Sequence, residues 1–324
     1  MSWMTYAEAS KEAVRAEMRR DTTVWALGED LGRGGVFGQY AGLQEEFGAK
    51  RIVDTPISEA AIMGSAVGAA MTGTRPIVEM RFSDFALCAI DELVNQAAKA
   101  RYMFGGQTRV PLVAREPVGM WRASAAQHSQ SLEAWYAHIP GLVVVMPATP
   151  ADNRGLLASA IRSDDPVVYM EHKGLWTMEG DVPEGDHLEP LGKAAVSRPG
   201  TDLTIITWSA TVTTCLEAAQ LLHEGAGINC EVIDLRTLWP WDQDTVLASV
   251  ARTKRALVVH EAVQVGGFGA EIAAVISEQL FDTLSGPVAR LGAPRAPIAY
   301  SPPLEAQVTI SAEKVGAKVR SMLD

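Results

Sequence analysis

DTPISEAAIMGSAVGAAMTGTRPIVE, residues 54–79, contains the pattern that decides the fold of this chain. The apolar run from Ile62 to Met71 is interrupted only by glycine and serine, and it predicts a helix over 58–71. Short runs of β-forming residues flank this helix at 51–54 and 76–79. These strands are apolar and do not alternate with polar residues, which is typical of a parallel sheet covered on both faces. The stretch therefore predicts a strand, a crossover helix and a second, parallel strand.

The same alternation extends in both directions from this unit. Thr5 and Glu8 form a capping-box pattern that opens a predicted helix running to Met18. Further strands are expected at 24–27, 111–115, 142–146 and 166–171, and further helices at 85–101, 129–137 and 150–162. Strands and helices in strict alternation predict an α/β domain with a doubly wound sheet.

A second, smaller α/β sheet is expected in the carboxy-terminal part of the chain. Between 174 and 200 the sequence is rich in glycine, proline and acidic residues and has no sustained period, which is typical of a domain boundary. Strands are then predicted at 203–207, 230–234, 256–260 and 288–291, and helices at 211–222, 243–251, 269–281 and 311–322. The sequence thus predicts two doubly wound domains, 1–185 and 200–324, joined by a linker at 186–199.

Composition and charge exclude several classes of protein. The chain has 324 residues, of which 48% are hydrophobic, and this is enough to build large cores. Its net charge of −11 disfavours binding to nucleic acid or to anionic membranes. The three cysteines show no C-x-x-C spacing, so neither a disulfide framework nor a zinc site is indicated. No apolar stretch reaches membrane-spanning length and no signal peptide is recognisable, so we expect a cytoplasmic chain.

The common nucleotide and hydrolase motifs are missing, and three other places suggest chemistry. There is no P-loop, no G-x-G-x-x-G after a strand and no G-x-S-x-G. Glu59 begins the helix of the opening stretch, either as an ordinary first-turn carboxylate below a Ser58 cap or as a carboxyl whose pKa is raised in an apolar cleft. Phe85 follows the carboxyl end of a parallel strand, where ligands of such sheets bind. His128 precedes a helix and could move protons, although most such histidines only face solvent.

Read together, these segments resemble the β subunits of the thiamine-dependent first component of 2-oxo acid dehydrogenase complexes. The similar segments are GEDLG (28–32), DTPISEAAIMGSAVGAAMTGTRPIVE (54–79), AIDELVNQAAKARYMFGGQ (89–107), AAQHSQS (125–131), PGLVVVMPATPAD (140–152), EVIDLRTLWPWD (231–242) and HEAVQVGGFGAEIAA (260–274). The resemblance implies a transketolase-like architecture, with a pyrimidine-binding domain over 1–185 and a transketolase C-terminal-like domain over 200–324.

The resemblance also implies roles for single residues. Glu59 corresponds to the carboxyl that hydrogen-bonds the aminopyrimidine ring of thiamine diphosphate and favours the tautomer that takes up the thiazolium proton. Phe85 corresponds to the ring that stacks on the pyrimidine, and His128 to an active-site histidine near the thiazolium. Ile57, Arg81 and Cys88 are expected around the same cofactor.

Half of the cofactor site is missing from this sequence. In the superfamily a G-D-G motif holds the diphosphate and its Mg²⁺, and no G-D-G occurs here. The resemblance therefore implies an α subunit that holds Mg²⁺, in an α₂β₂ heterotetramer. It also implies a structural K⁺ bound mainly by main-chain carbonyls. The corresponding positions are Leu112, Ala160, Ile161, Ser163 and Asp165.

The substrate is the least constrained part of the prediction. Arg81 stands where relatives commonly carry Met or Gln, and it either binds a substrate carboxylate or forms a salt bridge. Likeness of single segments favours a pyruvate or acetoin type over a branched-chain type by a narrow margin. We expect cleavage of a 2-oxo acid and transfer of the acyl group to a lipoyl group on a dihydrolipoyl acyltransferase core. A stand-alone transketolase-type enzyme and a catalytically inert scaffold are the less favoured alternatives.

Overall fold

A computed structural model describes residues 1–323, whose contacts group into two units. The first unit combines Met1–Val118 with Trp135–Leu191, and the second combines Gly119–Ala134 with the chain from Gly192 onward. Residues 119–134 thus pack with the second unit, although they lie inside the first domain expected from the sequence. The two units are each built on one mostly parallel sheet, so the predicted α/β fold class is confirmed.

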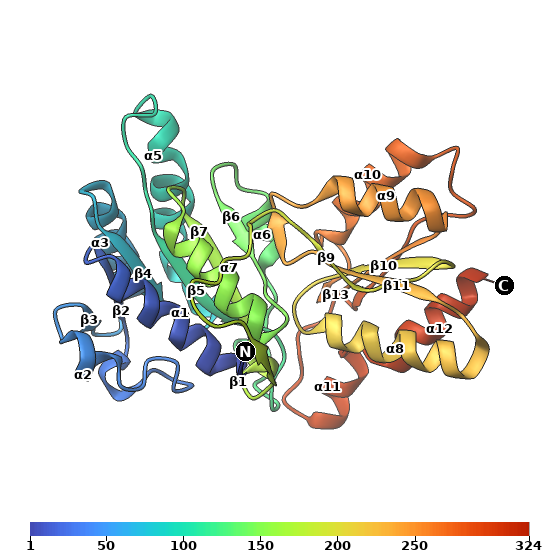
Figure 1. Cartoon of the computed structure of the whole chain (residues 1–324), viewed down its shortest axis with the longest axis horizontal. Helices are drawn as coiled ribbons and strands as arrows, with labels where there is room; N and C mark the ends of the chain where they lie inside the picture. Colours follow the sequence, from blue (N-terminus) through green and yellow to red (C-terminus); the bar gives the residue numbers. More distant parts are fainter. Residues whose placement is uncertain (324) are drawn as a thin grey trace. The chain divides into compact units, whose positions relative to one another are not determined.

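The first unit is built on a parallel sheet with the strand order β6-β7-β5-β4-β2-β3 (Figure 1). These strands are β2 (Val24–Gly28), β3 (Ile52–Asp54), β4 (Arg75–Glu79), β5 (Val113–Val118), β6 (Val143–Val145) and β7 (Val167–His172). The register places Gly28 of β2 beside both Asp54 and Glu79. The segments that follow β2, β3 and β4 therefore leave the sheet at a common edge, where ligands of doubly wound sheets bind.

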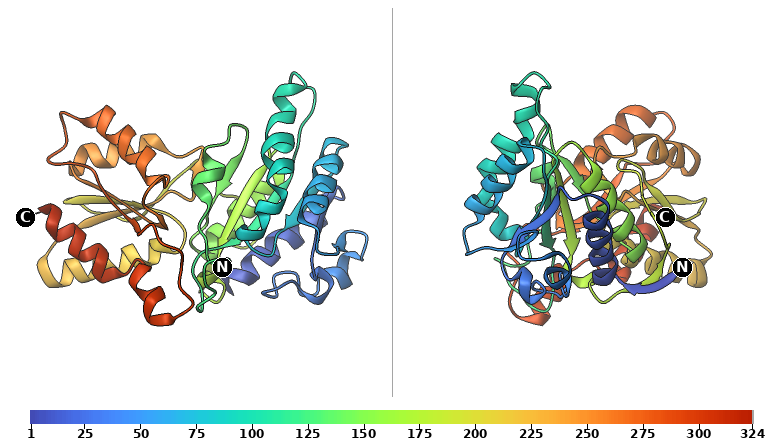
Figure 2. Two further views of the ribbon diagram at one scale, coloured as in Figure 1. Left: turned by 180° about the vertical axis from the view of Figure 1, so that it is seen from behind. Right: turned by 60° about the vertical axis from the view of Figure 1, so that its left-hand side comes forward.

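Helices cover both faces of this sheet. α1 (Tyr6–Arg20) and α7 (Pro150–Arg162) pack side by side on one face, and their apolar residues join the strands in a buried core. Viewed from behind, α3 (Glu59–Met71) and α5 (Ala98–Met103) lie on the other face (Figure 2). The predicted capping box is present, because Thr5 Oγ1 accepts the Glu8 amide at 3.1 Å and the Thr5 amide donates to the Glu8 carboxylate at 2.9 Å.

The helix predicted over 85–101 is not a single regular helix. It consists of α4 (Ser83–Ala86), a 3₁₀ turn (Leu87–Ala89), a π-helical segment (Glu92–Ala97) and then α5. Asn95 and Gln96 donate to the two oxygens of Asp91 at 2.7 and 3.3 Å. The bond from Gln96 spans five residues, which matches the wider repeat of a π-helix. The prediction was wrong here because a uniform apolar pattern does not reveal a change of helical pitch.

The second unit is built on a sheet with the strand order β14-β13-β10-β11-β9, in which only β9 is antiparallel. The strands are β9 (Ala195–Arg198), β10 (Leu203–Thr207), β11 (Cys230–Asp234), β13 (Ala256–Val263) and β14 (Ala289–Ala293). In Figure 1, α9 (Gln243–Thr253) and α10 (Gly269–Leu280) lie on one face, and α8 (Thr211–Ala226) and α12 (Ala312–Leu323) lie on the other. Shorter elements of the chain are β1 (Ser2–Thr5), α2 (Leu43–Phe47), α6 (Glu133–Ala137), β12 (Thr237–Trp239) and α11 (Pro302–Val308).

The segment expected to be irregular, 174–200, contains two strands. β8 (Glu179–Val182) pairs antiparallel with β1, and β9 pairs antiparallel with β11. Both strands are short and mostly exposed edge strands, so they carry no apolar pattern that a sequence could show. Two strands therefore went unpredicted, and β9 lies within the linker proposed at 186–199.

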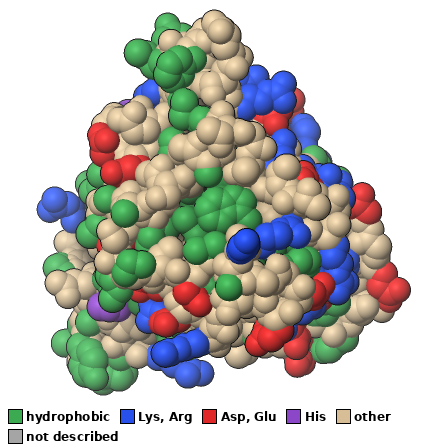
Figure 3. Space-filling model, turned by 90° about the vertical axis from the view of Figure 1, so that its left-hand side faces the viewer, with side chains coloured by type: hydrophobic (Ala, Val, Ile, Leu, Met, Phe, Trp, Pro, Cys, Tyr) green, Lys and Arg blue, Asp and Glu red, His purple; other side chains and the backbone are tan. Residues whose placement is uncertain are grey.

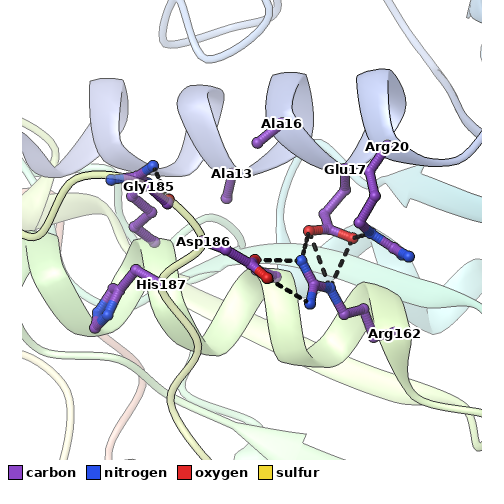
Figure 4. Close-up of a pocket in the computed structure, with 10 residues that line it drawn as sticks. Ala13, Ala16, Glu17, Arg20, Arg162, Gly185, Asp186 and His187 are labelled. Atoms are coloured by element: carbon purple, nitrogen blue, oxygen red, sulfur yellow. Dashed lines mark hydrogen bonds and ion pairs between the residues drawn. The ribbon is translucent and has the colours of Figure 1, made fainter.

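Arginines tie the chain after β8 to the helices beneath it (Figure 4). Arg154 donates to the Gly185 carbonyl at 2.8 Å, and Arg162 pairs with Asp186 at 2.5 Å and with Glu17 at 2.7 Å. A cavity of about 350 Å³ lies between this segment, α1 and α7. Its acidic side chains both pair with Arg162, so we interpret the cluster as a structural tie. In the described part of the chain, no helix is long and apolar enough to cross a membrane.

Candidate functional site

Glu59 is the first residue of α3 and directly follows the loop after β3. Its side chain is half-buried, and Ser58 makes no side-chain cap hydrogen bond. The expectation of a Ser58 cap was therefore wrong, and the first turn of α3 keeps unsatisfied amide groups next to Glu59. Ile57 on the approach to this helix is 77% exposed, which is unusual for an aliphatic side chain. The amino end of α3 thus combines a carboxyl, free helix amides and an uncovered apolar side chain.

A second carboxyl from another strand lies within electrostatic range of Glu59. Glu29 directly follows β2, and burial raises its pKa; Arg81 opposes this shift, while the charge of Glu59 adds to it. Burial and the nearby negative charge of Glu59 thus both favour the protonated form of Glu29. The structure therefore places a second carboxyl, Glu29, within electrostatic range of Glu59, where the sequence analysis had singled out only Glu59.

Arg81 forms ion pairs with Glu29 and with the neighbouring Asp30. Its guanidinium lies 2.8 Å from the Asp30 carboxylate and 3.7 Å from that of Glu29. Of the two interpretations of Arg81, the structure thus shows the salt bridge. The positive charge of Arg81 is therefore paired with carboxylates of the loop after β2. It lowers the pKa of Glu29, whereas burial raises it.

Phe85 lies on α4 as part of an aromatic row in the first unit. Its ring meets that of Phe82 edge to face, with 5.5 Å between centroids and 70° between planes. Phe82 meets Phe37 in the same manner at 6.4 Å, and Phe37 stacks on Trp176 at 4.9 Å and 14°. Cys88, one turn beyond Phe85, is exposed. The Phe85 ring is half-buried, so part of it is available to a flat ligand.

His128 lies on the loop that packs with the second unit. Three non-glycine residues shortly before it, Arg122, Ala123 and Ala125, have φ angles of 48°, 54° and 62°. Such left-handed residues are strained and persist where the surroundings impose them, which is common at functional loops. Glu261 supports the loop by accepting from the Met120 amide at 2.8 Å and from Ser131 Oγ at 3.2 Å. A cavity of about 570 Å³ lies beside this loop, and His128 is not among its lining residues, which include Gln127, Ser129, Glu261 and Arg295.

The carbonyls expected to hold K⁺ already have partners within the chain. Arg75 Nη1 donates to the Ile161 carbonyl at 3.1 Å and to the Ser163 carbonyl at 2.7 Å. The Leu112 carbonyl accepts the Val167 amide at 2.9 Å. Arg75 thus places a fixed positive charge at two of the five predicted ligands, and a second cation at those two oxygens would be repelled.

Sequence reasoning missed Glu29, Gln39 and Glu79 as parts of this region. Glu29 had a usable signal, because it follows the carboxyl end of a parallel strand in the same way as Arg81 does. Gln39 had none, since it lies in a glycine-rich loop without any period. Its position becomes apparent only when that loop folds over the end of β4, where Gln39 Nε2 donates to Glu79 at 3.1 Å.

Comparisons with known proteins agree with the geometry of both units. Residues 2–178 match the model of the transketolase pyrimidine-binding domain, and residues 192–315 match that of the transketolase C-terminal domain. The chain is 43% identical to the 2-oxoisovalerate dehydrogenase subunit beta of Bacillus subtilis, with 100% of each chain covered. The chain belongs to the β subunits of thiamine-diphosphate-dependent 2-oxo acid dehydrogenases.

Members of this β-subunit family with different names are equally similar to the chain. It is 44% identical to the acetoin:2,6-dichlorophenolindophenol oxidoreductase subunit beta of Cupriavidus necator, over 97% of this chain and 96% of the relative. It is also 44% identical to the pyruvate dehydrogenase E1 component subunit beta of Rickettsia bellii, over 93% of each chain. Among solved structures, a split-gene transketolase in an inactive β4 tetramer superposes with a TM-score of 0.81 at 22% identity, covering 98% of this chain and 97% of that one. This likeness shows a transketolase-like fold over nearly the whole length.

Proposed function

We propose that this β subunit binds the pyrimidine half of thiamine diphosphate between the carboxyl of Glu59 and the ring of Phe85. The observation that carries the proposal is the half-buried carboxyl of Glu59 at the amino end of α3, and the half-buried ring of Phe85 in the same unit supports it. An aminopyrimidine offers ring nitrogens to a carboxyl and a flat face to an aromatic ring, so these side chains fit it. Ile57 is apolar and exposed at the same helix end, and a cofactor or partner would remove it from water.

The residues of this chain would control protons around the cofactor. When bound, thiamine diphosphate supplies an electron sink for cleaving the bond next to the substrate carbonyl. Glu59 would hold a proton at the pyrimidine ring nitrogen, with the carboxyl of Glu29 within electrostatic range of it. His128 is proposed to assist proton transfer or the approach of the lipoyl group. Cys88 and Arg81 belong to the surroundings of this site and not to the proton path.

An α subunit completes the proposed site. The relatives are named as β subunits, and this sequence lacks the G-D-G motif for diphosphate and Mg²⁺. Figure 3 shows apolar side chains gathered at the centre of one face, bordered by basic and acidic side chains. Tyr102, Met103 and Phe104 in the first unit are also more than half exposed. Exposed apolar surface of this kind is typical of a subunit interface, and we propose an α₂β₂ heterotetramer in which α holds Mg²⁺.

We propose a pyruvate-like 2-oxo acid as substrate, with acetoin or a branched-chain 2-oxo acid as the alternatives. The acyl product is expected to pass to a lipoyl group of a dihydrolipoyl acyltransferase core. Identities of 43–44% to relatives of all three kinds do not separate these substrates. The α subunit contributes to the substrate pocket, so the choice requires a measurement on the assembled enzyme.

The test is the assembled enzyme with and without the carboxyl at position 59. The chain is co-purified with its α subunit and assayed with thiamine diphosphate, Mg²⁺, an artificial electron acceptor and a panel of pyruvate, acetoin and branched-chain 2-oxo acids. Glu59→Gln should lower kcat by about 100-fold or more, as loss of a catalytic acid or base does. Glu313→Gln, which changes another first-turn glutamate on α12, should leave kcat unchanged. A Glu59→Gln enzyme with full kcat would disprove the proposed role.

A further inference from the structure

Gln39 occupies a buried position between the glycine-rich loop and the end of β4. Its side chain is 1% exposed, and both ends of its amide are used. Oε1 accepts the amide of Phe37 at 2.8 Å, and Nε2 donates to Glu79 Oε1 at 3.1 Å. Because the two bonds need opposite ends of the amide, they fix its orientation as well as its place.

The anchor of this amide is itself held by buried charges. Glu79 is 5% exposed, and its other oxygen lies 3.3 Å from the guanidinium of Arg115. Arg115 is shared, since it also pairs with Glu171 at 2.6 Å and lies over the ring of Tyr40. Burial raises the pKa of Glu79 to about 7, Arg115 opposes this shift and Glu171 adds to it. The guanidinium of Arg115 is thus the shared ion-pair partner of two carboxyls, Glu79 and Glu171, in the protein interior.

The residue that Gln39 holds leads to the proposed cofactor site. Phe37 is stacked on Trp176 on one side and meets the edge of Phe82 on the other. Phe82 in turn meets Phe85, and the ammonium of Lys173 lies 4.6 Å above the Phe82 ring. Aromatic contacts of this kind prefer particular angles. A displacement of the Phe37 backbone is therefore passed along the row to the Phe85 ring.

We propose that Gln39, held by Glu79, is a positioning residue that sets the orientation of the Phe85 ring. This inference rests on the proposed function, because it assumes that Phe85 stacks on the pyrimidine. Gln39 does not need to touch the cofactor. Gln39 fixes the orientation of the Phe85 ring before the cofactor binds. It therefore affects the affinity for the cofactor more than the rate of the chemical step.

The first experiment separates affinity from turnover. Calorimetric titration of the assembled heterotetramer with thiamine diphosphate and Mg²⁺ gives Kd without any catalysis. Gln39→Leu should raise Kd by about 10-fold, as expected when a buried hydrogen bond to a charged group is lost. At saturating cofactor, kcat should stay within about 2-fold of the wild-type value, because the reacting atoms are not touched.

Gln44→Leu is the matched control. Gln44 on α2 also makes two hydrogen bonds, to the Ile52 carbonyl at 2.9 Å and to Asp54 at 3.2 Å, but it does not hold Phe37. Its Kd should stay close to wild type even if both variants lose similar thermal stability. Equal Kd values for wild type and Gln39→Leu would overturn the inference. If wild-type enzyme fails to bind thiamine diphosphate at all, the proposed function fails instead.

A pH series tests the anchor. Ionised Glu79 accepts a stronger hydrogen bond than the neutral acid, so the ring should be fixed best above about pH 7. The charged or titratable groups that face it are Arg115 on β5, Glu171 on β7 and Tyr40 on the loop. Between pH 6 and 8 the Kd of wild type should improve several-fold more than that of Glu79→Gln. An identical pH dependence in the two proteins would count against Glu79 as the anchor.

Discussion

At the scale of single residues, the most unusual group outside the proposed site is Glu116 on β5. It is fully buried, and Ser83 Oγ donates to its Oε2 at 3.0 Å, while its Oε1 has no hydrogen-bond partner in the described residues. Burial raises the pKa of Glu116 to about 8, although the hydroxyls of Ser83 and Tyr136 lower it. Glu116 is therefore mostly protonated at neutral pH, and Ser83 links it to the helix that carries Phe85.

Glu116→Gln should remove a pH-dependent loss of stability. The folded state keeps the proton between the ordinary pKa of 4.5 and the folded pKa of about 8, so unfolding releases it and stability falls as pH rises through this window. From pH 5.5 to 8.5 the variant should gain about 2–4 kcal/mol relative to wild type. Thermal unfolding at both pH values measures this gain, with Glu45→Gln on exposed α2 as control. A difference between wild type and variant that does not change with pH would contradict the assignment.

Arg75 makes a second residue-scale prediction, about K⁺. Because its guanidinium already holds the Ile161 and Ser163 carbonyls, replacing K⁺ by tetramethylammonium should shift the Tm of the wild-type protein by less than about 2 °C, less than the shift expected for 1 kcal/mol. Arg75→Met frees those oxygens, and its Tm should then rise with added K⁺ but not with tetramethylammonium. A large K⁺ effect on wild type would show that the carbonyls bind the ion despite Arg75.

At the scale of elements, two glycines in turns of the first unit differ in what a side chain would meet. Comparing their alanine variants distinguishes the energetic cost of a steric clash from that of backbone strain. Gly141, in the turn before β6, has φ 102°, and a Cβ there would collide with the Ala98 carbonyl oxygen. Gly48, after α2, has φ 83° and open space around it. Gly48→Ala should cost about 2 kcal/mol through the backbone alone, because φ 83° with ψ 157° is a conformation essentially confined to glycine.

Gly141→Ala should cost at least about 3 kcal/mol, because strain and the clash with Ala98 act together. Chemical denaturation of the two variants beside wild type gives both values. Equal losses for the two variants would mean that the turn before β6 relaxes away from Ala98.

The elements that could be predicted are those in which local sequence signals indicate both the first and the last residue. β10, β11 and α7 begin and end at the predicted residues, since each joins an apolar run to clear flanking signals, such as the Thr149 cap of α7. β8 and β9 were missed because edge strands depend on a partner strand and not on their own apolar pattern. The site divides in the same way. Glu59 and Phe85 lie at recognisable element ends, whereas the place of Gln39 depends on how a loop of glycines closes over another strand.

At the scale of the whole molecule, each unit buries a group that makes stability depend on pH, and the two dependences have opposite signs. His260 in the second unit is fully buried, stacks on Trp208 at 5.2 Å and lies 3.1 Å from the Ala262 carbonyl. Burial lowers the pKa of His260 to about 4. Its contribution to stability is therefore present above the ordinary pKa of 6.5 and is lost as pH falls towards 4. The Glu116 effect in the first unit has the opposite sign and acts at higher pH.

Between pH 7 and 4.5, the free energy of unfolding should fall less for His260→Gln than for wild type. The variant lacks the buried imidazole, which resists protonation in the folded state. His223→Gln, which changes an exposed histidine on α8, should follow the wild-type curve. Hydrogen exchange followed by mass spectrometry can report both units in one sample. Loss of protection in the first unit before the second at pH 4.5 would contradict this account.

The path of the chain has a consequence for any attempt to divide the protein. The backbone leaves the first unit after Val118, returns at Trp135 and leaves it again after Leu191. A gene divided once, after residue 191, would give two fragments. In the first, residues 119–134 would lack the second unit with which they pack. In the second, the surface that these residues cover would be exposed to water. We therefore expect neither fragment to be stably folded when expressed alone, and we expect the His128 loop to lose its structure most.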